Sequence, residues 1–218
     1  MRFATRLVVA WTVAALVACG GGDDALPIGQ RFPTAADAPG TKPDPVETRQ
    51  TPEDLDEFIP AFTHALIDPN RAEMTTVFEE AGFVEAGLDV RFYGETHDPE
   101  APHLFSWFIE LESDDGAASV LDWVEADSMK PCPKSCATRV STFDVDGIPG
   151  ARGVHRVATA EAIEAAGTED EHPFENYWMG FTAGSIVYTI DLSGPPGSVT
   201  EEQAQSIMSA LHDRVTGD

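Results

Sequence analysis

The chain has 218 residues, 42% of them hydrophobic, which is enough for one domain with a substantial core. It carries 13 basic and 38 acidic residues, for a formal net charge of −25 at pH 7. A surface of that sign repels phosphate backbones and anionic headgroups, so the composition argues against nucleic acid as a partner. Such a charge is typical of a protein kept dispersed in solution, and it also attracts cations or a basic partner.

The first 18 residues have the pattern of a signal peptide. Two arginines precede an apolar run from Leu7 to Ala18, which is too short to span a bilayer as a mature helix. The run ends in Leu16-Val17-Ala18-Cys19, which resembles the lipobox of bacterial lipoproteins. The resemblance implies that residues 1–18 are removed and that Cys19 carries acyl chains such as palmitate. It thereby implies a lipid-anchored protein on the extracytoplasmic face of the cell membrane; the alternative is ordinary cleavage near Ala18, with the cysteine incidental.

Residues 19–50 are expected to form the lipidated N-terminus and a tether. Prolines interrupt regular structure from Pro27 to Pro45, and the few apolar residues show no period. Such a segment is predicted to be largely disordered and extended. The globular domain is then expected to cover residues 51–218.

Helical spacing of apolar residues begins at the start of that domain. Thr51-Pro52 places proline directly after a capping residue, and the stripe that follows predicts a helix over 53–67, kinked or split at Pro60. Asp68-Pro69 repeats the signature and predicts a second helix that ends at Gly82.

Beyond that glycine the pattern changes to aromatic and β-branched residues, which are typical of strands. Strands are predicted over 88–93, 104–111, 139–145, 153–158, 176–182 and 185–192. Further helices are predicted over 117–124 and 199–215, the last opened by a capping box at Ser198 or Thr200, and a short helix or turn is predicted over 159–166.

Strands joined mainly by hairpins predict one α+β domain, an antiparallel sheet of about six strands with helices packed on it. The stretches Ser106–Ser113 and Ser185–Ser193 resemble each other and each precedes a helix, which raises the possibility of a ββα repeat. The element order over residues 51–215 resembles small extracytoplasmic α+β domains of the PsbP-like kind, found in some actinobacterial lipoproteins.

Cys132-Pro-Lys-Ser-Cys136 is the most specific local motif of the domain. With Cys19 lipidated, an exported environment favours a disulfide between Cys132 and Cys136, which would pin the end of one helix to the next strand. The alternative is copper, because a Cys-x₃-Cys pair plus a histidine resembles the metal motif of copper-delivering SCO-like proteins. In those proteins the pair follows a strand, whereas here it follows a predicted helix.

One polar loop concentrates side chains that can bind a metal. Glu95, His97 and His103 are the candidate ligands, and zinc would need three or four such groups to converge. Their spacing matches no known arrangement, and the same residues are typical of an exposed acidic loop. The other histidines, among them His155 and His172, have no evident partner in the sequence and are interpreted as surface or core residues.

Two further motifs are interpreted as hairpin turns. Asp144-Val-Asp146-Gly147 lacks the third ligand and the closing glutamate of an EF-hand, and Gly180–Gly184 lies between two strands, unlike a nucleophile elbow. Four aromatic residues near the hairpins are interpreted as core residues in preference to pocket walls: Trp107, Tyr177, Trp178 and Tyr188.

No nucleophile–base pair and no cofactor motif can be singled out. The sequence therefore favours a non-catalytic binding module for an unknown protein or small-molecule ligand. The alternative is an extracytoplasmic metal-assisted hydrolase that uses Glu95, His97 and His103.

Overall fold

The computed structural model describes residues 26–44, 54–62, 70–94, 101–130, 138–167 and 172–217. In this part of the chain, a single antiparallel sheet of seven strands has the order β1-β2-β3-β7-β6-β5-β4. The strands are β1 (Thr41–Pro43), β2 (Phe83–Tyr93), β3 (His103–Leu111), β4 (Arg139–Phe143), β5 (Arg152–Ala158), β6 (Phe174–Ala183) and β7 (Ile186–Gly194). The α-helices are α1 (Leu55–Phe62), α2 (Arg71–Glu80), α3 (Asp114–Ser128), α4 (Ala160–Ala166) and α5 (Glu201–Thr216). The predicted α+β class is confirmed.

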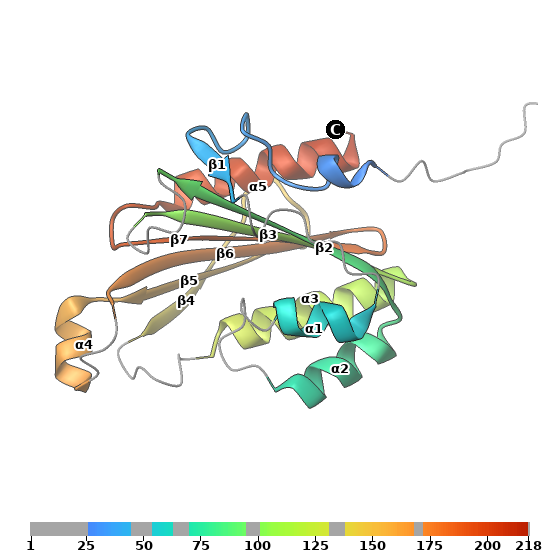
Figure 1. Ribbon diagram of the computed structural model, residues 1–218, viewed down its shortest axis with the longest axis horizontal. Coiled ribbons are helices and arrows are strands. Elements are labelled where there is room, and N and C mark those ends of the chain that lie inside the picture. Colours follow the sequence, from blue (N-terminus) through green and yellow to red (C-terminus); the bar gives the residue numbers. More distant parts are fainter. Residues whose placement is uncertain are drawn as a thin grey trace, which may run out of the picture.

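The sheet lies between two covering layers (Figure 1). Helices α1, α2 and α3 pack on one face, where aromatic rings of α1 contact Trp107 of β3 and Phe78 of α2 contacts Phe83 of β2. Helix α5 and residues 26–44 cover the opposite face, and α4 lies at one end of the molecule, beside the start of β6. Two hydrophobic cores therefore form, one on each side of the sheet.

The domain begins earlier in the chain than the sequence pattern indicates. Phe32 is fully buried against Phe108, with 5.3 Å between ring centroids, and β1 pairs with β2 as an edge strand. Arg214 of α5 donates a hydrogen bond to the carbonyl oxygen of Phe32 at 2.8 Å. The prediction of a disordered tether is therefore wrong for residues 26–44, because one buried ring and a three-residue strand leave no periodic signal in the sequence.

One predicted helix boundary differs from the observed one. The cap of α2 is Asn70, whose side chain accepts from the Glu73 amide at 3.3 Å, and not the predicted Asp68-Pro69. The helix ends at Glu80, with Ala81 as its C-cap and Gly82 next at a φ of 73°, so the glycine follows the helix as the sequence predicts. Helix α1 is described over part of the predicted 53–67 segment and runs through Pro60.

The second half of the chain agrees closely with its pattern. The turn between β6 and β7 places Gly184 at a φ of 58°, and α5 begins with the predicted capping box between Thr200 and Gln203. Helix α4 is capped by Thr159, whose hydroxyl accepts from the Ala162 amide at 3.2 Å.

The possible ββα repeat is not confirmed. In both units a hairpin precedes a helix, and β3 lies antiparallel to β7 at the middle of the sheet. A two-fold axis that relates antiparallel neighbours runs perpendicular to the sheet and would place both helices on the same face. Helices α3 and α5 pack on opposite faces.

Candidate functional site

Four polar residues form one row across the sheet. His103 of β3 pairs with Ser193 of β7, Ser193 with Asn176 of β6, and Asn176 with Arg156 of β5. Residues that pair across antiparallel strands project to the same face. By the two-residue period of β3, this face is also that of Trp107, which the helical layer covers further along the strand.

A buried hydrogen-bond network joins three of these residues to Asp191. Arg156 donates through Nε to Asn176 Oδ1 at 2.7 Å and through Nη2 to Asp191 Oδ2 at 3.0 Å. Asn176 Nδ2 donates to Asp191 Oδ1 and, at 2.6 Å, to Ser193 Oγ, which donates to Asp191 Oδ1 at 2.8 Å. Because Arg156 is only 5% exposed and Asn176 2%, the charge of Asp191 balances a guanidinium held out of solvent.

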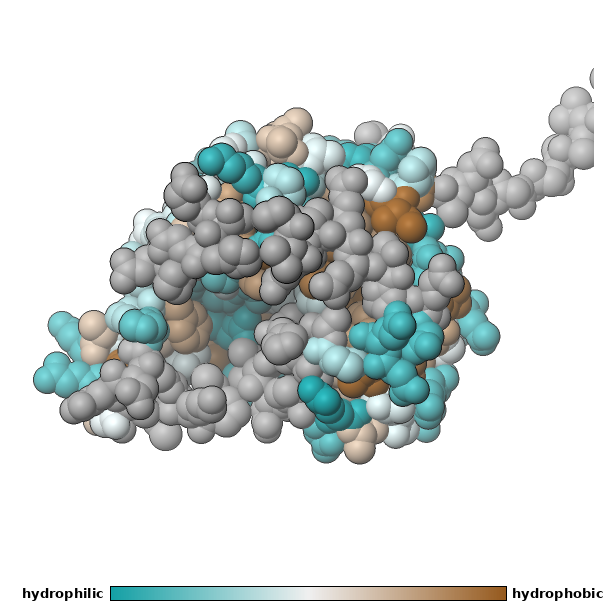
Figure 2. Space-filling model, in the orientation of Figure 1, coloured by the Kyte–Doolittle hydropathy of each residue, from teal (hydrophilic) through white to brown (hydrophobic). Residues whose placement is uncertain are grey.

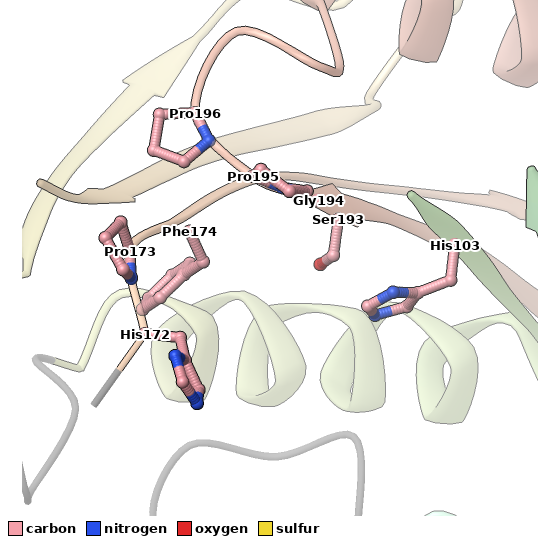
Figure 3. Close-up of a pocket in the computed structure, with 8 residues that line it drawn as sticks. All are labelled: His103, His172, Pro173, Phe174, Ser193, Gly194, Pro195 and Pro196. Carbon is pink, nitrogen blue, oxygen red and sulfur yellow. The ribbon is translucent and has the colours of Figure 1, made fainter. Parts of the chain in front are cut away.

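A cavity of about 510 Å³ opens beside Ser193. Figure 3 shows the Ser193 hydroxyl and the His103 imidazole on the same side of the sheet, facing the space in front of α3, with the Phe174 ring across from His103. In the orientation of Figure 1, the space-filling view shows a hollow with hydrophilic atoms on its floor, between α4 and the helical layer (Figure 2). The described residues that line the cavity are His103, His172, Pro173, Phe174, Ser193, Gly194, Pro195 and Pro196.

One wall of the cavity depends on a glycine. A Cβ on Gly194 would lie 2.5 Å from Ser198 Oγ and 3.1 Å from Pro102 Cβ, so only glycine lets the turn after β7 pack this closely. Ser198 in turn closes the segment by donating through Oγ to the carbonyl oxygen of Pro195 at 2.6 Å. The Pro195-Pro196 wall is therefore fixed by local hydrogen bonds and close packing.

His103 is held between two aromatic rings. Its imidazole packs edge-on against Phe105 at 5.2 Å and lies 5.9 Å from the Phe92 ring, between centroids. Nδ1 lies 3.4 Å from the carbonyl oxygen of Ala101. These contacts orient a ring that is partly exposed to the cavity.

The turn after β7, which contains Pro195, Pro196 and Gly197, is supported from the other face of the sheet. Its support comes from His155, Glu175 and Tyr177. His155 stacks on Tyr177 at 4.4 Å, and its Nε2 lies 3.0 Å from Glu175 Oε1. Tyr177 donates to Glu175 Oε1 at 2.9 Å, and the Gly197 amide donates to Oε2 at 2.7 Å. His155 is thus a partly buried residue paired with Glu175, a contact that is not evident in the sequence.

Protonation follows from these contacts. Burial, followed by the hydrogen bond to Glu175, raises the pKa of Tyr177 to about 12, so its hydroxyl stays a donor. Burial raises the pKa of Glu175, but hydrogen bonds from Gly197, Tyr177 and His155 outweigh it, and the net pKa is lowered. A charged carboxylate thus anchors the turn that carries the cavity wall.

The structure places only one of the three candidate metal ligands. His103 lines the cavity, whereas Glu95 and His97 lie outside the described residues. Within the described ranges, no group of three or more His, Cys, Asp or Glu side chains is arranged to hold a metal ion. Cys19, Cys132 and Cys136 also lie outside those ranges, so the lipid anchor and the disulfide stay predictions.

No helix in the described part of the chain is long and apolar enough to cross a membrane. The four aromatic residues near the hairpins are core residues, as interpreted: Trp107, Tyr177, Trp178 and Tyr188 are each at most 8% exposed. They are absent from the described cavity lining.

The network residues were missed in the sequence. A usable signal was present, since Arg156, Asn176 and Asp191 occupy positions that the two-residue period assigns to a core-facing side. Buried polar residues on one face of adjacent strands indicate either a structural network or a site.

No protein-family model matches the chain, and no curated protein matches it. Among solved structures, the chain is similar to the extracellular domain of PknH from Mycobacterium tuberculosis, with a TM-score of 0.54 and 14% sequence identity. The likeness covers 87% of this chain and 95% of that one. At this identity it shows a shared fold and nothing further, and the PsbP-like resemblance is not confirmed.

Proposed function

We propose that this chain is a membrane-anchored extracytoplasmic module that binds a small ligand in the cavity beside Ser193. The observation that carries the proposal is the cavity itself, with a hydrogen-bonded polar network at its edge. Its volume of about 510 Å³ falls in the range of small-molecule sites.

The composition of the lining supports a binding site. Proline rings and Phe174 supply apolar surface, while His103, His172 and Ser193 supply polar atoms. A mostly apolar wall with few polar groups is what orients a small ligand. The network behind Ser193 would hold that hydroxyl in one position before the ligand arrives.

The chemistry of Ser193 supports binding in preference to catalysis. Its hydroxyl donates to Asp191, whose charge is already balanced by Arg156. In the described part of the chain, Ser193 has no hydrogen bond to a histidine that could act as its base. A nucleophilic role for this serine therefore lacks support.

The extracytoplasmic location rests on two independent observations. The Leu16-Val17-Ala18-Cys19 stretch resembles a lipobox, and the similar solved structure is described as an extracellular domain. Cys19 is the proposed site of lipidation, and Cys132 and Cys136 are the proposed disulfide in that environment.

Ligand binding is tested by screening a small-molecule library for compounds that raise the melting temperature of the full mature chain. Compounds that stabilise the wild type should fail to stabilise Phe174→Ala, which removes a cavity wall. Phe143→Ala is the matched control, because Phe143 is also partly buried but packs against Tyr177 on the other face. Equal responses from both variants would contradict the cavity as the site.

Anchoring is tested separately. Wild-type protein should incorporate an acyl-chain probe in cells and fractionate with membranes, and Cys19→Ala should do neither. A wild-type protein without label would overturn the anchor while leaving the ligand site open to its own test.

A metal-assisted hydrolase is the second candidate, and the observation in its favour is that His103 lines the cavity. It predicts that zinc binds the full chain stoichiometrically and that His97→Ala weakens binding as much as His103→Ala. Calorimetric titration that shows no zinc uptake by the wild type, or uptake by either variant equal to that of the wild type, would remove this candidate.

A further inference from the structure

The hydrogen bonds around the cavity indicate which ligand chemistry it accepts. The direction of each bond is fixed by groups that can act in only one way. A guanidinium only donates, so Arg156 Nε requires the oxygen of the Asn176 amide to face it. The Asn176 amino group must therefore face Asp191 and Ser193, as observed.

This orientation of the Asn176 amide also determines where the hydroxyl proton of Ser193 points. Asp191 is paired with Arg156 and, when ionised, only accepts hydrogen bonds, so the Ser193 hydroxyl donates to it at 2.8 Å. One Ser193 lone pair already accepts from Asn176 at 2.6 Å. What remains toward the cavity is a single acceptor, and Ser193 can only receive a hydrogen bond from a ligand.

His103, like Ser193, offers a hydrogen-bond acceptor to the cavity. A carbonyl oxygen only accepts, so the contact between Nδ1 and the Ala101 oxygen, at 3.4 Å, assigns the proton of a neutral ring to Nδ1. Nε2 is then left as an acceptor. Both His103 and Ser193 thus offer lone pairs, on the same side of the sheet (Figure 3).

The charge around the cavity indicates which kind of hydrogen-bond donor a ligand would carry. Of the described residues that line the cavity none is lysine or arginine, and the chain has a net charge of −25. Arg156 Nη1 lacks a hydrogen-bond partner among the described atoms, but it is sealed from solvent and Arg156 is absent from the described lining. The Phe174 ring adds a face that attracts cations.

From this arrangement we infer that the cavity binds a small organic cation, a protonated amine on an apolar body, with its N–H groups directed at Ser193 and His103. The inference rests on the proposed function and specifies the ligand class. The ammonium supplies the donors that the two acceptors lack, and the apolar body lies against Phe174 and the proline wall.

The test uses three probes with one ring and different polar ends: benzylamine, benzyl alcohol and benzoate. Each is titrated into ¹⁵N-labelled mature protein while the backbone amide resonances around the cavity are followed, namely those of His172, Phe174, Ser193, Gly194 and Gly197. Benzylamine should bind about tenfold more tightly than benzyl alcohol, because hydrogen bonds that involve a charged group are the stronger ones. Benzoate should bind most weakly.

Two variants test whether Ser193 and His103 are the groups that accept hydrogen bonds from benzylamine. Ser193→Ala and His103→Phe should each weaken benzylamine binding about tenfold, and the second variant keeps the aromatic packing around position 103. Ser206→Ala, on an exposed position of α5, is the matched control and should bind as the wild type does.

The outcomes separate the ligand class from the function. Preferred binding of benzoate, or of benzyl alcohol over benzylamine, at these resonances would overturn the cation inference and leave a small-ligand site in place. If no probe shifts these resonances at millimolar concentration and the library screen also finds no ligand, both the inference and the proposed function fail.

Discussion

One face of the sheet has two ends that differ sharply. At one end, the α1 rings of Phe58 and Phe62 pack against Trp107, with Phe62 4.9 Å from it between ring centroids, and Phe78 of α2 packs on those two rings. At the other end, the row from His103 to Arg156 places polar side chains at equally core-facing positions, and a cavity opens beside them. The strands are continuous between the two ends, so the change is one of side chains and of the layer that covers them.

The difference shows how the fold combines stability with a site. Aromatic contacts at the apolar end bury large rings and have no unmet polar requirement, with the exception of Trp107 Nε1, which has no partner among the described residues. The polar end satisfies Asp191 with three donors and keeps one acceptor, Ser193, turned to the cavity. We expect mutations at the two ends to act on different properties.

The largest expected effect on stability is at the apolar end. Phe78 is fully buried and touches Phe58 and Phe62, so Phe78→Ala should lower the free energy of unfolding by about 3–5 kcal/mol. Urea denaturation measures this. Ligand affinity of the fraction that stays folded should be unchanged, and a loss of affinity equal to that of a cavity variant would break the comparison.

At the polar end, Asp191→Ala leaves the guanidinium of Arg156 buried without its counter-charge. Removing one partner of a fully buried pair costs about 3–5 kcal/mol; because the Asp191 side chain is 14% exposed, we expect about 2–3 kcal/mol here. Ligand binding should be abolished as well, since the Ser193 proton is released from its fixed direction. Retained binding in calorimetry would show that the network has only a structural role.

Gly194→Ala should disturb the cavity wall by overpacking. The new methyl group would lie 2.5 Å from Ser198 Oγ, and overpacking of this kind costs about 1–3 kcal/mol. We expect weaker ligand binding than in the wild type, because the Pro195-Pro196 wall must shift. Adding Ser198→Ala should recover part of the loss; no recovery would contradict this contact as its cause.

The smallest expected effect is on the pH dependence of stability, through Glu175, which supports the cavity wall from the other face of the sheet. The pKa of Glu175 is lowered from its ordinary value of 4.5, so its stabilising contribution is present above that pKa and is lost as the pH falls through the folded-state value. Glu175→Gln should therefore flatten the loss of melting temperature below about pH 4.5. Glu164→Gln, on the exposed side of α4, should leave the acid profile unchanged.

The sequence predicts most of the architecture, because hairpins and amphipathic helices leave local signals. The capping box at Thr200 and the turn at Gly184 are examples, each contained within a few residues. Phe32 and β1 were missed because their packing is non-local. The start of α2 was misplaced because Asp68 and Asn70 are both capping residues close together in the chain.

The candidate site was largely beyond reach of the sequence for the same reason. His103 was singled out for its loop, but its neighbours Ser193, Asn176 and Arg156 come from strands far apart in the chain. Only the register of four strands brings them into one row. In the sequence, such a network is visible only as polar residues at core-facing positions. That signal does not show which residues pair with one another.

If the cavity beside Ser193 is a ligand site, it should hold a small molecule in the cell. Native mass spectrometry of the mature protein, purified from its own membranes, would detect that ligand. We expect one small-molecule adduct on the wild type and on Phe143→Ala, and its loss from Phe174→Ala. An adduct that persists in Phe174→Ala, or a wild-type protein that repeatedly carries none, would contradict the cavity as a ligand site.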